Sequence, residues 1–358
     1  MRKSLMCLMV LVFAVALALP AAAQEGDEAL AEHLGGATEF ARVDERTGVT
    51  LLLDWVPNTN HLGFYVAQSL GYFDEANLEV SIQEPTDLQV ETVVISGAAQ
   101  FGVSYQELAT YALADDAPIV SLAAIIQHNT SGFVTLHEQD PIERPADLAG
   151  MVYGGFGQPD LELAVLDRLL ECDGAEPGTI EYVDVGYAEP FPLMERDRFD
   201  LAWMYYAWTG IDAELRGVEL DAVMLMDYFD CLPDYYTPIL IASREMVETQ
   251  PDVVRAFVHA TARGFAYAIE HPDEAAAMLS EAVPELDPEL VLASAEWLAP
   301  QYRADAPRWG EQSADIWQGF SDFLVEHGIL AEGIDADAAF TNEFLPGEVE
   351  EAVQDSEG

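Results

Sequence analysis

Lysine is almost missing from this chain, because Lys3 is the only lysine in 358 residues. Lysine and arginine together number 14 against 65 acidic residues, which gives a formal net charge of −51. A chain with this charge repels nucleic acid and anionic membranes, so neither is expected as a partner. The acids are spread among aromatic and aliphatic residues, which a disordered tail would lack. Molar salt shortens the Debye length to about 3 Å and screens their repulsion, so the composition predicts the surface of a halophilic protein.

Catalytic signatures are absent as well. No H-E-x-x-H, G-x-S-x-G or P-loop pattern occurs, and the seven histidines are scattered. Only Cys172 and Cys231 lie beyond the first segment, and neither has a metal-ligand spacing. The residues therefore predict no enzyme, cofactor or metal site. The two cysteines form a disulfide, which an exported protein permits, or remain two buried free thiols, and the sequence leaves both possibilities open.

Residues 1–23 are expected to be a secretory signal peptide. Arg2 and Lys3 precede an apolar run that ends at Pro20, and three alanines follow as an A-x-A cleavage site. A membrane anchor is the alternative, but a run of roughly fifteen apolar residues is short for a spanning helix. Cys7 has no apolar region before it and is therefore not the cysteine of a lipoprotein signal. We predict a protein exported across the inner membrane to the periplasm or another extracytoplasmic space.

The pattern beyond the signal predicts two α/β lobes. From Val49, strand, loop, helix and strand patterns follow within about 35 residues, as at the start of a parallel sheet. A second α/β set begins after a proline-rich connection at 141–148, and the apolar spacing becomes helical after Ser243. We expect crossings between the lobes near 139–145 and 237–243, with a ligand cleft between the lobes. The expected division is a loose segment at 24–47, lobe 1 at 48–140 plus 243–346, lobe 2 at 145–238, and an acidic tail at 347–358.

Three clusters suit a flat ligand. Residues 54–61, Asp-Trp-Val-Pro-Asn-Thr-Asn-His, follow a strand and offer an indole for stacking and amides for hydrogen bonds. In the alternative interpretation, Trp55 is core and the asparagines shape a turn. Residues 154–157, Gly-Gly-Phe-Gly, would let a ligand approach backbone N–H groups, although the third glycine of a dinucleotide fingerprint is missing. Residues 203–208 carry four aromatic rings, so one or two are expected to face the cleft.

The opening cluster, with Gly63–Ala67 and Gly71–Phe73, resembles the family of thiamine-pyrimidine precursor binding proteins and fungal pyrimidine synthases. The resemblance covers roughly residues 48–270, and its further matches are Ser104–Glu107, Ile126–Ser131, Pro145–Gly150 and Asp234–Pro238. It implies a type II periplasmic-binding-protein fold. It also implies that a monomer delivers a formylaminomethyl- or hydroxymethyl-pyrimidine, for salvage, to the permease and ATPase subunits of an ABC importer.

The resemblance also implies roles for individual residues. A tryptophan of the opening motif and a tyrosine of the second lobe sandwich the ring in that family, which assigns Trp55 and either Tyr205 or Tyr206. Where the family often has an acidic residue after the aromatic cluster, this chain has Thr209, and Glu162 is the candidate substitute. The expected ligand-binding residues are Trp55, Asn58, Asn60, His61, Gly154, Gly155, Phe156, Glu162, Tyr205, Tyr206, Trp208 and Asp234.

The enzymatic branch of the family is disfavoured by the residues themselves. The fungal synthases hold pyridoxal phosphate on a lysine and carry a cysteine-rich metal motif. Without the signal this chain has no lysine to form a Schiff base, and it has no cysteine cluster. Within the binding class, a receptor for riboflavin, nitrate or a sulfonate is the alternative, and a sensor domain of a signalling receptor is another. We therefore expect a solute-binding protein and no enzyme.

Overall fold

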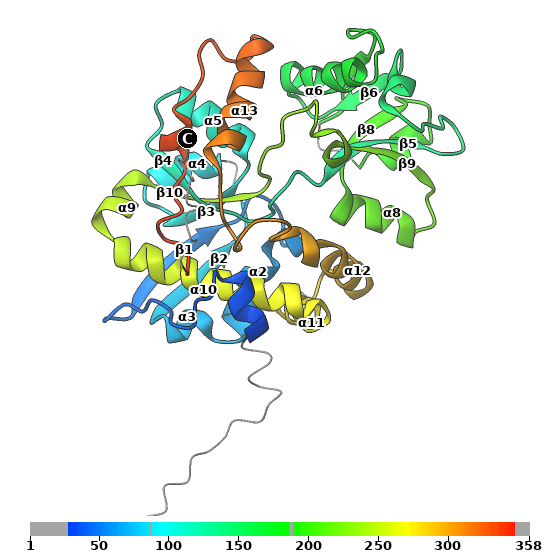
Figure 1. Cartoon of the computed structure of the whole chain (residues 1–358). Coiled ribbons are helices and arrows are strands. Elements are labelled where there is room, and N and C mark those ends of the chain that lie inside the picture. The colour runs from blue at the N-terminus through cyan, green and yellow to red at the C-terminus, as the bar shows by residue number, and fades with distance from the viewer. Residues whose placement is uncertain (1–27, 86–87, 187–188, 348–358) are drawn as a thin grey trace, which may run out of the picture.

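The computed structural model describes residues 28–85, 88–186 and 189–347, which form two α/β lobes (Figure 1). Each lobe is built on one five-stranded sheet, with the orders β2-β1-β3-β10-β4 and β7-β6-β8-β5-β9. The helices lie against the faces of these sheets. The predicted fold class is confirmed.

Lobe 1 combines the start of the chain with its last third. β1 pairs in parallel with β2 and β3, whereas β10 runs antiparallel to β3 and β4. Every residue of β4 is buried, as its continuous apolar run predicts. The elements of this lobe are β1 (Thr47–Leu52), η1 (Thr59–His61), α2 (Leu62–Ser69), α3 (Tyr72–Glu75), β2 (Leu78–Gln83), α4 (Val90–Ile95), β3 (Phe101–Ser104), α5 (Gln106–Ala114), β4 (Ile119–Ala124), β10 (Ile239–Ser243), α9 (Arg244–Thr249), α10 (Pro251–Glu270), α11 (Pro272–Ala282), α12 (Pro288–Leu298), η5 (Ala299–Gln301) and α14 (Ala336–Ala339).

Lobe 2 is the green part of Figure 1. In its sheet, β6 pairs in parallel with β7 and β8, and β5 runs antiparallel to β8 and β9. Its elements are β5 (Ser131–Leu136), η2 (Pro145–Leu148), β6 (Val152–Gly155), α6 (Pro159–Cys172), β7 (Glu181–Asp184), α7 (Phe191–Met194), β8 (Leu201–Tyr205), η3 (Tyr206–Gly210), α8 (Ile211–Leu215), β9 (Leu220–Met224) and η4 (Leu225–Tyr228).

The first crossing between the lobes comes earlier than the sequence indicated. β5, which we expected in lobe 1, pairs with β8 and β9 of the second sheet. The chain therefore crosses at residues 125–130, between β4 and β5, and returns at residues 229–238, before β10. The apolar pattern of a buried strand does not reveal which sheet supplies its hydrogen-bond partners, and this explains the difference.

The segment expected to be loose is packed from residue 28 onward. Leu34 and Val43 are buried, and the backbone N–H of Ala41 donates to Nδ1 of His259 over 3.0 Å. The backbone N–H of Trp309 donates to the carbonyl of His33 over 2.8 Å. The segment is therefore held against lobe 1 by two buried apolar side chains, although its composition is acidic. The expected signal peptide at 1–23 and the acidic tail from 348 lie outside the described residues.

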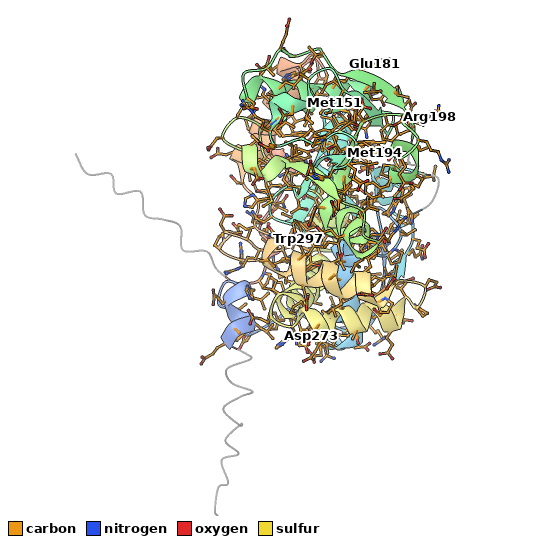
Figure 2. All side chains as sticks on the ribbon, turned by 90° about the vertical axis from the view of Figure 1, so that its right-hand side faces the viewer. Met151, Glu181, Met194, Arg198, Asp273 and Trp297 are labelled. Atoms are coloured by element: carbon orange, nitrogen blue, oxygen red, sulfur yellow. A yellow bond between two sulfur atoms is a disulfide. The ribbon has the colours of Figure 1, made fainter. Side chains whose placement is uncertain are left out.

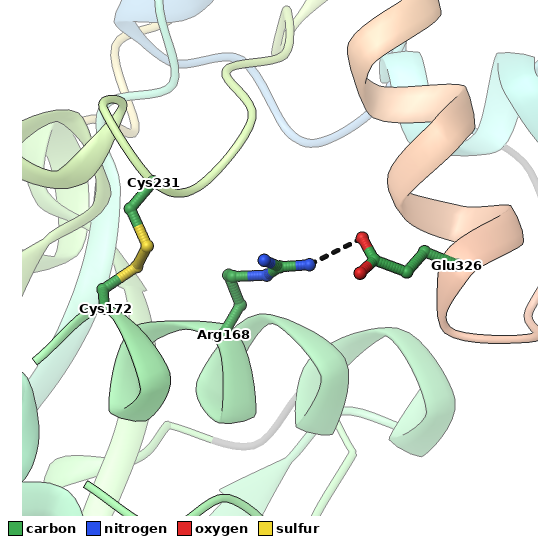
Figure 3. The surroundings of a disulfide bond; sticks show 4 residues. All are labelled: Arg168, Cys172, Cys231 and Glu326. Atoms are coloured by element: carbon green, nitrogen blue, oxygen red, sulfur yellow. Dashed lines mark hydrogen bonds and ion pairs between the residues drawn. A yellow bond between two sulfur atoms is a disulfide. The ribbon is translucent and has the colours of Figure 1, made fainter. Parts of the chain in front are cut away.

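α13 (Ala314–Glu326) contributes side chains to the cores of both lobes. Trp317 is buried in a core cluster of lobe 1, whereas Phe320 and Phe323 are buried in a core cluster of lobe 2. Near its end, Glu326 accepts a hydrogen bond of 2.7 Å from Arg168 of α6 (Figure 3). The helix therefore connects the lobes beside the two crossings. Across the described ranges, no helix is both long and apolar enough to span a membrane.

Cys172 and Cys231 form a disulfide (Figure 3). Cys172 ends α6, Cys231 lies in the second crossing, and their Cα atoms are 5.9 Å apart. Of the two possibilities that the sequence left open, the structure has the bridge. It ties the second crossing to the main helix of lobe 2.

We predict that Cys172→Ser destabilises lobe 2. The cysteines are 59 residues apart, and loss of a native disulfide that closes a loop of this size costs about 2–4 kcal/mol. Urea unfolding followed by fluorescence, with and without reductant, measures this cost. The control is the double variant Cys172→Ser/Cys231→Ser, whose midpoint should no longer respond to reductant. A wild-type midpoint that also ignores reductant would contradict the prediction.

Candidate functional site

The loop after β1 presents Trp55 at the carboxyl edge of the lobe 1 sheet. The side chains of Trp55 and Val56 are 45% and 47% exposed, whereas Leu51, Leu52 and Leu53 just before them are buried. A large ring left exposed at a strand's carboxyl end, in an open α/β sheet, lies where such folds bind ligands. The structure therefore excludes the alternative in which Trp55 is core.

A buried hydrogen-bond network holds this loop in shape. The backbone N–H of Asn58 donates to Nδ1 of His61 over 3.2 Å, so the ring proton lies on Nε2, which donates to Asp54 over 2.7 Å. Oδ1 of Asn58 accepts from the backbone of Asn60 over 2.8 Å, and Nδ2 donates to the carbonyl of Val56 over 3.1 Å. His61 is fully buried. The polar atoms of Asn58 and His61 thus shape the turn, and half-buried Asn60 lies on its surface. That these residues bind the ligand stays a prediction.

Asp54 connects the loop to the next strand of the sheet. Burial raises the pKa of Asp54, but His61 and the hydroxyl of Tyr105 outweigh it and hold that pKa below its ordinary value. Tyr105 directly follows β3, the parallel neighbour of β1, and therefore reaches the same sheet edge. Burial, Asp54 and Tyr205 raise the pKa of Tyr105 well above its ordinary value. Because Tyr205 ends β8 in lobe 2, this pair of tyrosines spans the two lobes.

Two further residues complete what we call the interlobe cluster: Asp54, Tyr105, Glu107, Tyr205 and Tyr235. Tyr235 belongs to the second crossing and is buried. Burial, Glu107 and Tyr205 raise the pKa of Tyr235 well above its ordinary value. The cluster thus draws on both lobes and on a crossing. Tyr105 and Glu107 were missed as site residues, although their position just after β3 parallels that of Trp55 after β1.

α12 supports both the Trp55 loop and lobe 2. The hydroxyls of Ser294 and Thr59 are buried and lie 2.6 Å apart. Three residues further along the helix, the ring of Trp297 lies 5.2 Å from that of Tyr206 in lobe 2. In Figure 2, Trp297 lies where gold α12 meets the green lobe. α12 therefore bonds the Trp55 loop through Ser294 and contacts lobe 2 through Trp297.

Two predicted ligand residues of lobe 2 serve this contact between the lobes. The ring of Tyr206 lies tilted against that of Trp297, and its hydroxyl donates to Glu214. Trp208 packs on the core of lobe 1. Of the two tyrosines assigned to the second face of the ligand, the structure places Tyr205 in the interlobe cluster and Tyr206 in the contact with α12.

The glycine loop of lobe 2 is organised by Glu162, which is fully buried. Its carboxylate accepts from the Tyr153 hydroxyl over 2.6 Å, from the Phe156 backbone over 3.0 Å and from the Gln158 backbone over 2.6 Å. A side chain at Gly155 would overlap this carboxylate, and one at Gly154 would overlap Phe199. Glu162 therefore holds the turn through its hydrogen bonds, and Gly154 and Gly155 are required by packing. Their contact with a ligand stays a prediction. Half-buried Phe156 lies at 5.8 Å from Trp203, ring to ring.

Asp234, which we also expected to bind the ligand, joins the two crossings. Its carboxylate accepts from the backbone of Asn129 over 3.1 Å and from that of Tyr235 over 2.8 Å. Nδ1 of His128 donates to Asp234 over 2.6 Å, and Nε2 donates to Asp305 over 2.8 Å. With a carboxylate at each nitrogen, His128 is an imidazolium. The hydrogen bond to Asp234, aided by Asp305 and opposed by burial, raises the pKa of His128 to about 9.

A cavity of about 550 Å³ lies elsewhere, on lobe 1, where residues 30–42 cover α3 and α10. None of its lining residues belongs to the interlobe cluster. Among the residues that the structure describes, no three histidine, cysteine or acidic side chains are placed to hold a metal ion.

Residues 58–275 match the model of the family described as NMT1/THI5 like. The chain belongs to the NMT1/THI5-like family. The formylaminopyrimidine-binding protein of Halalkalibacterium halodurans is 29% identical over an alignment of 299 residues, and the match covers 82% of this chain and 89% of that protein. The 4-amino-5-hydroxymethyl-2-methylpyrimidine phosphate synthase of Legionella pneumophila is 27% identical over 308 residues, 84% of this chain and 93% of that protein. NMT1/THI5-like relatives thus carry the names of a binding protein and of an enzyme.

A solved structure supports the fold of this NMT1/THI5-like chain. The periplasmic aliphatic sulphonate binding protein SsuA from Escherichia coli matches with a TM-score of 0.63 at 15% identity. The match covers 85% of this chain and 94% of that one. At this identity it shows the fold of periplasmic binding proteins alone.

Glu162→Gln should destabilise this protein by about 1–3 kcal/mol, because the new amide group faces donors where the carboxylate accepted hydrogen bonds. Urea unfolding measures the change. The matched control is Asp160→Asn, an exposed acid two residues earlier in α6, which should stay within about 0.5 kcal/mol of wild type. Equal midpoints for the two variants would contradict the role of Glu162 in the turn.

His128 should titrate near pH 9. Its pKa is raised in the folded protein, so its contribution to stability is complete below its ordinary pKa of about 6.5 and is lost as the pH rises through about 9. An NMR titration of the imidazole signals measures the midpoint. Asp305→Asn removes the exposed partner and should lower the midpoint while Asp234 stays in place. A wild-type midpoint near 6.5 would show that the two hydrogen bonds do not form in solution.

Proposed function

We propose that this chain is an extracytoplasmic solute-binding protein whose two lobes close on a flat aminopyrimidine of the thiamine-precursor type. The observation that carries the proposal is the exposed ring of Trp55 at the carboxyl end of β1, in the loop whose Asp54 bonds Tyr105. Asp54, the residue before Trp55, bonds Tyr105, and Tyr105 of lobe 1 interacts electrostatically with Tyr205 of lobe 2. The relative named for binding a formylaminopyrimidine supports the ligand class.

The residue types fit such a ligand. A flat ring between aromatic side chains gains roughly 0.5–1.5 kcal/mol per aromatic pair beyond its burial. Specificity comes from buried polar groups, because each one that a wrong ligand leaves unpaired costs about 1–3 kcal/mol. Trp55 supplies the stacking surface, Tyr205 is the candidate ring opposite, and the hydroxyl and carboxyl groups of the interlobe cluster are the candidate hydrogen-bond partners.

The residues favour binding over synthesis. The synthase branch of the family, as the resemblance describes it, needs a lysine for pyridoxal phosphate, and Lys3 is the only lysine here. That branch also needs a cysteine cluster, whereas Cys172 and Cys231 are joined in a disulfide. A receptor that takes up its ligand and releases it needs neither group.

An anionic ligand such as nitrate or a sulfonate is less well matched. None of the five residues of the interlobe cluster is basic. Arg144, the arginine that the sequence placed nearest to a crossing, pairs with Asp173 instead. A neutral heterocycle therefore fits better, and riboflavin remains the alternative of that kind.

The cellular role follows from the same proposal. The chain would act outside the inner membrane as a monomer and deliver its ligand to the permease and ATPase subunits of an ABC importer. The signal-peptide pattern at 1–23 and the fold of periplasmic binding proteins support this location.

We expect a formylaminomethyl- or hydroxymethyl-pyrimidine to raise the unfolding temperature in about 2–3 M salt. Thiamine, riboflavin, nitrate and taurine should leave it unchanged. Trp55→Ala should weaken binding of the stabilising pyrimidine at least tenfold, by roughly 1.4 kcal/mol, without changing the fold. Val56→Ala, at the equally exposed neighbour, is the control and should bind as wild type. If only riboflavin or an anion raised the unfolding temperature, the proposed pyrimidine ligand would be wrong and that compound would be the ligand.

A further inference from the structure

The glycine loop of lobe 2, residues 154–157, has the construction of an anion-binding turn. It joins the end of β6 to the start of α6, and three of its four residues are glycine. Backbone N–H groups at the start of a helix, together with the helix dipole, favour a negative charge. Here the backbone N–H groups of Phe156 and Gln158 and the hydroxyl of Tyr153 all donate toward one position.

The chain itself supplies the anion at this position. The carboxylate of Glu162, in the first turn of α6, accepts all three hydrogen bonds, over 2.6, 3.0 and 2.6 Å. These partners are all donors, as a carboxylate requires. Burial, Glu162 and Tyr205 of the interlobe cluster raise the pKa of Tyr153, so its hydroxyl keeps its proton and donates. Glu162 is fully buried and thus occupies the turn completely.

The glycine loop lies at the edge of the lobe 2 sheet that faces lobe 1. β6 and β8 are parallel neighbours, so their carboxyl ends share one edge. Tyr206, directly after β8, lies 5.2 Å ring to ring from Trp297 of lobe 1. Phe156 of the loop lies 5.8 Å ring to ring from Trp203 of β8. The buried carboxylate is therefore at the same sheet edge as the aromatic rings that the proposed function assigns to the ligand.

Neutral dipoles, and not a cation, hold the charge of Glu162. The ion-paired arginines of lobe 2 have other carboxylates as partners: Arg144 pairs with Asp173, Arg168 with Glu326 and Arg216 with Asp212. A second anion brought to the glycine loop would find its three donors already used. It would also meet a buried like charge, which salt screens much less than an exposed one.

We propose that Glu162 acts as an internal anion that closes the glycine loop to phosphate and sulfonate groups, and so restricts the receptor to uncharged ligands. This inference rests on the proposed function and adds the ligand feature that is rejected. A hydroxymethyl-pyrimidine satisfies the restriction, whereas its phosphate ester does not.

The first experiment empties the turn and refills it. Glu162→Ala removes the carboxylate and leaves three donors around a space that takes a small carboxylate such as formate. In about 2–3 M sodium chloride, replacing about 0.1 M of the chloride by formate should raise the unfolding temperature of this variant by about 2 °C or more. If the variant folds poorly, its refolding yield in formate against chloride gives the same readout.

Wild type and Glu162→Gln are the controls for the formate experiment. In both, a side chain already fills the turn, so formate should shift neither unfolding temperature beyond the effect of chloride. A Glu162→Ala variant that does not respond to formate, or a wild type that responds equally, would overturn the inference, because the donors would then not form an anion-binding turn.

The second experiment measures by calorimetry how the protein discriminates between the hydroxymethyl-pyrimidine and its phosphate ester. Wild type should bind the alcohol at least tenfold more tightly, which corresponds to roughly 1.4 kcal/mol. Glu162→Gln keeps the volume but removes the charge, so this preference should fall at least about threefold, chiefly through tighter binding of the ester. Asp160→Asn, which removes an exposed and screened charge two residues away, is the matched control and should keep the preference.

The outcomes separate this inference from the proposed function. If wild type binds neither compound, the proposed function fails and the selection of ligands fails with it, even if formate stabilises Glu162→Ala. If wild type binds the ester as tightly as the alcohol, the function stands and the inference is overturned. An equal change in affinity for both compounds in Glu162→Gln assigns this residue a structural role alone, which also overturns the inference.

Discussion

The carboxylate of Asp234 holds together the two segments on which both lobes depend. It accepts hydrogen bonds from the backbone of Asn129 in the first crossing and of Tyr235 in the second, and from the ring of His128. The two crossings are therefore tied side by side by one side chain. They also carry the residues that lie between the lobes, so the position of Tyr235 in the interlobe cluster depends on this clamp. This carboxylate, which the sequence assigned to a ligand, bonds backbone groups of both crossings.

Two helices of the C-terminal part complete this frame on either side of the hinge. α13 places Trp317 in one core and Phe320 in the other. α12 bonds the Trp55 loop through Ser294 and contacts lobe 2 through Trp297. One helix therefore contacts both the Trp55 loop and the opposite lobe.

The two carboxyls of the interlobe cluster differ in charge because their partners differ. Asp54 is buried but receives hydrogen bonds from His61 and Tyr105, so its pKa is lowered. Glu107 is buried as deeply, and its Oε2 receives none, so its pKa rises to about 7. Environments that push two acids in opposite directions are typical of functional sites. In a chain with 65 acidic residues, composition does not distinguish these two from the rest, whereas burial and partners do.

The sequence by itself determined the fold class, the family resemblance and the place of Trp55. Strand and helix periods are local, and the carboxyl end of a parallel strand is a site in any open α/β sheet. Only the tertiary structure decided which sheet takes β5, that Cys172 pairs with Cys231, and which groups of the protein His61, Glu162 and Asp234 bond. The reason is that a polar side chain carries the same chemistry whether its partner is a ligand or a distant backbone group. Asp234 accepts a hydrogen bond from the backbone of Asn129, which is 105 residues away in the sequence. Oε2 of Glu107 accepts none. The residues next to Asp234 and Glu107 in the sequence do not predict this difference.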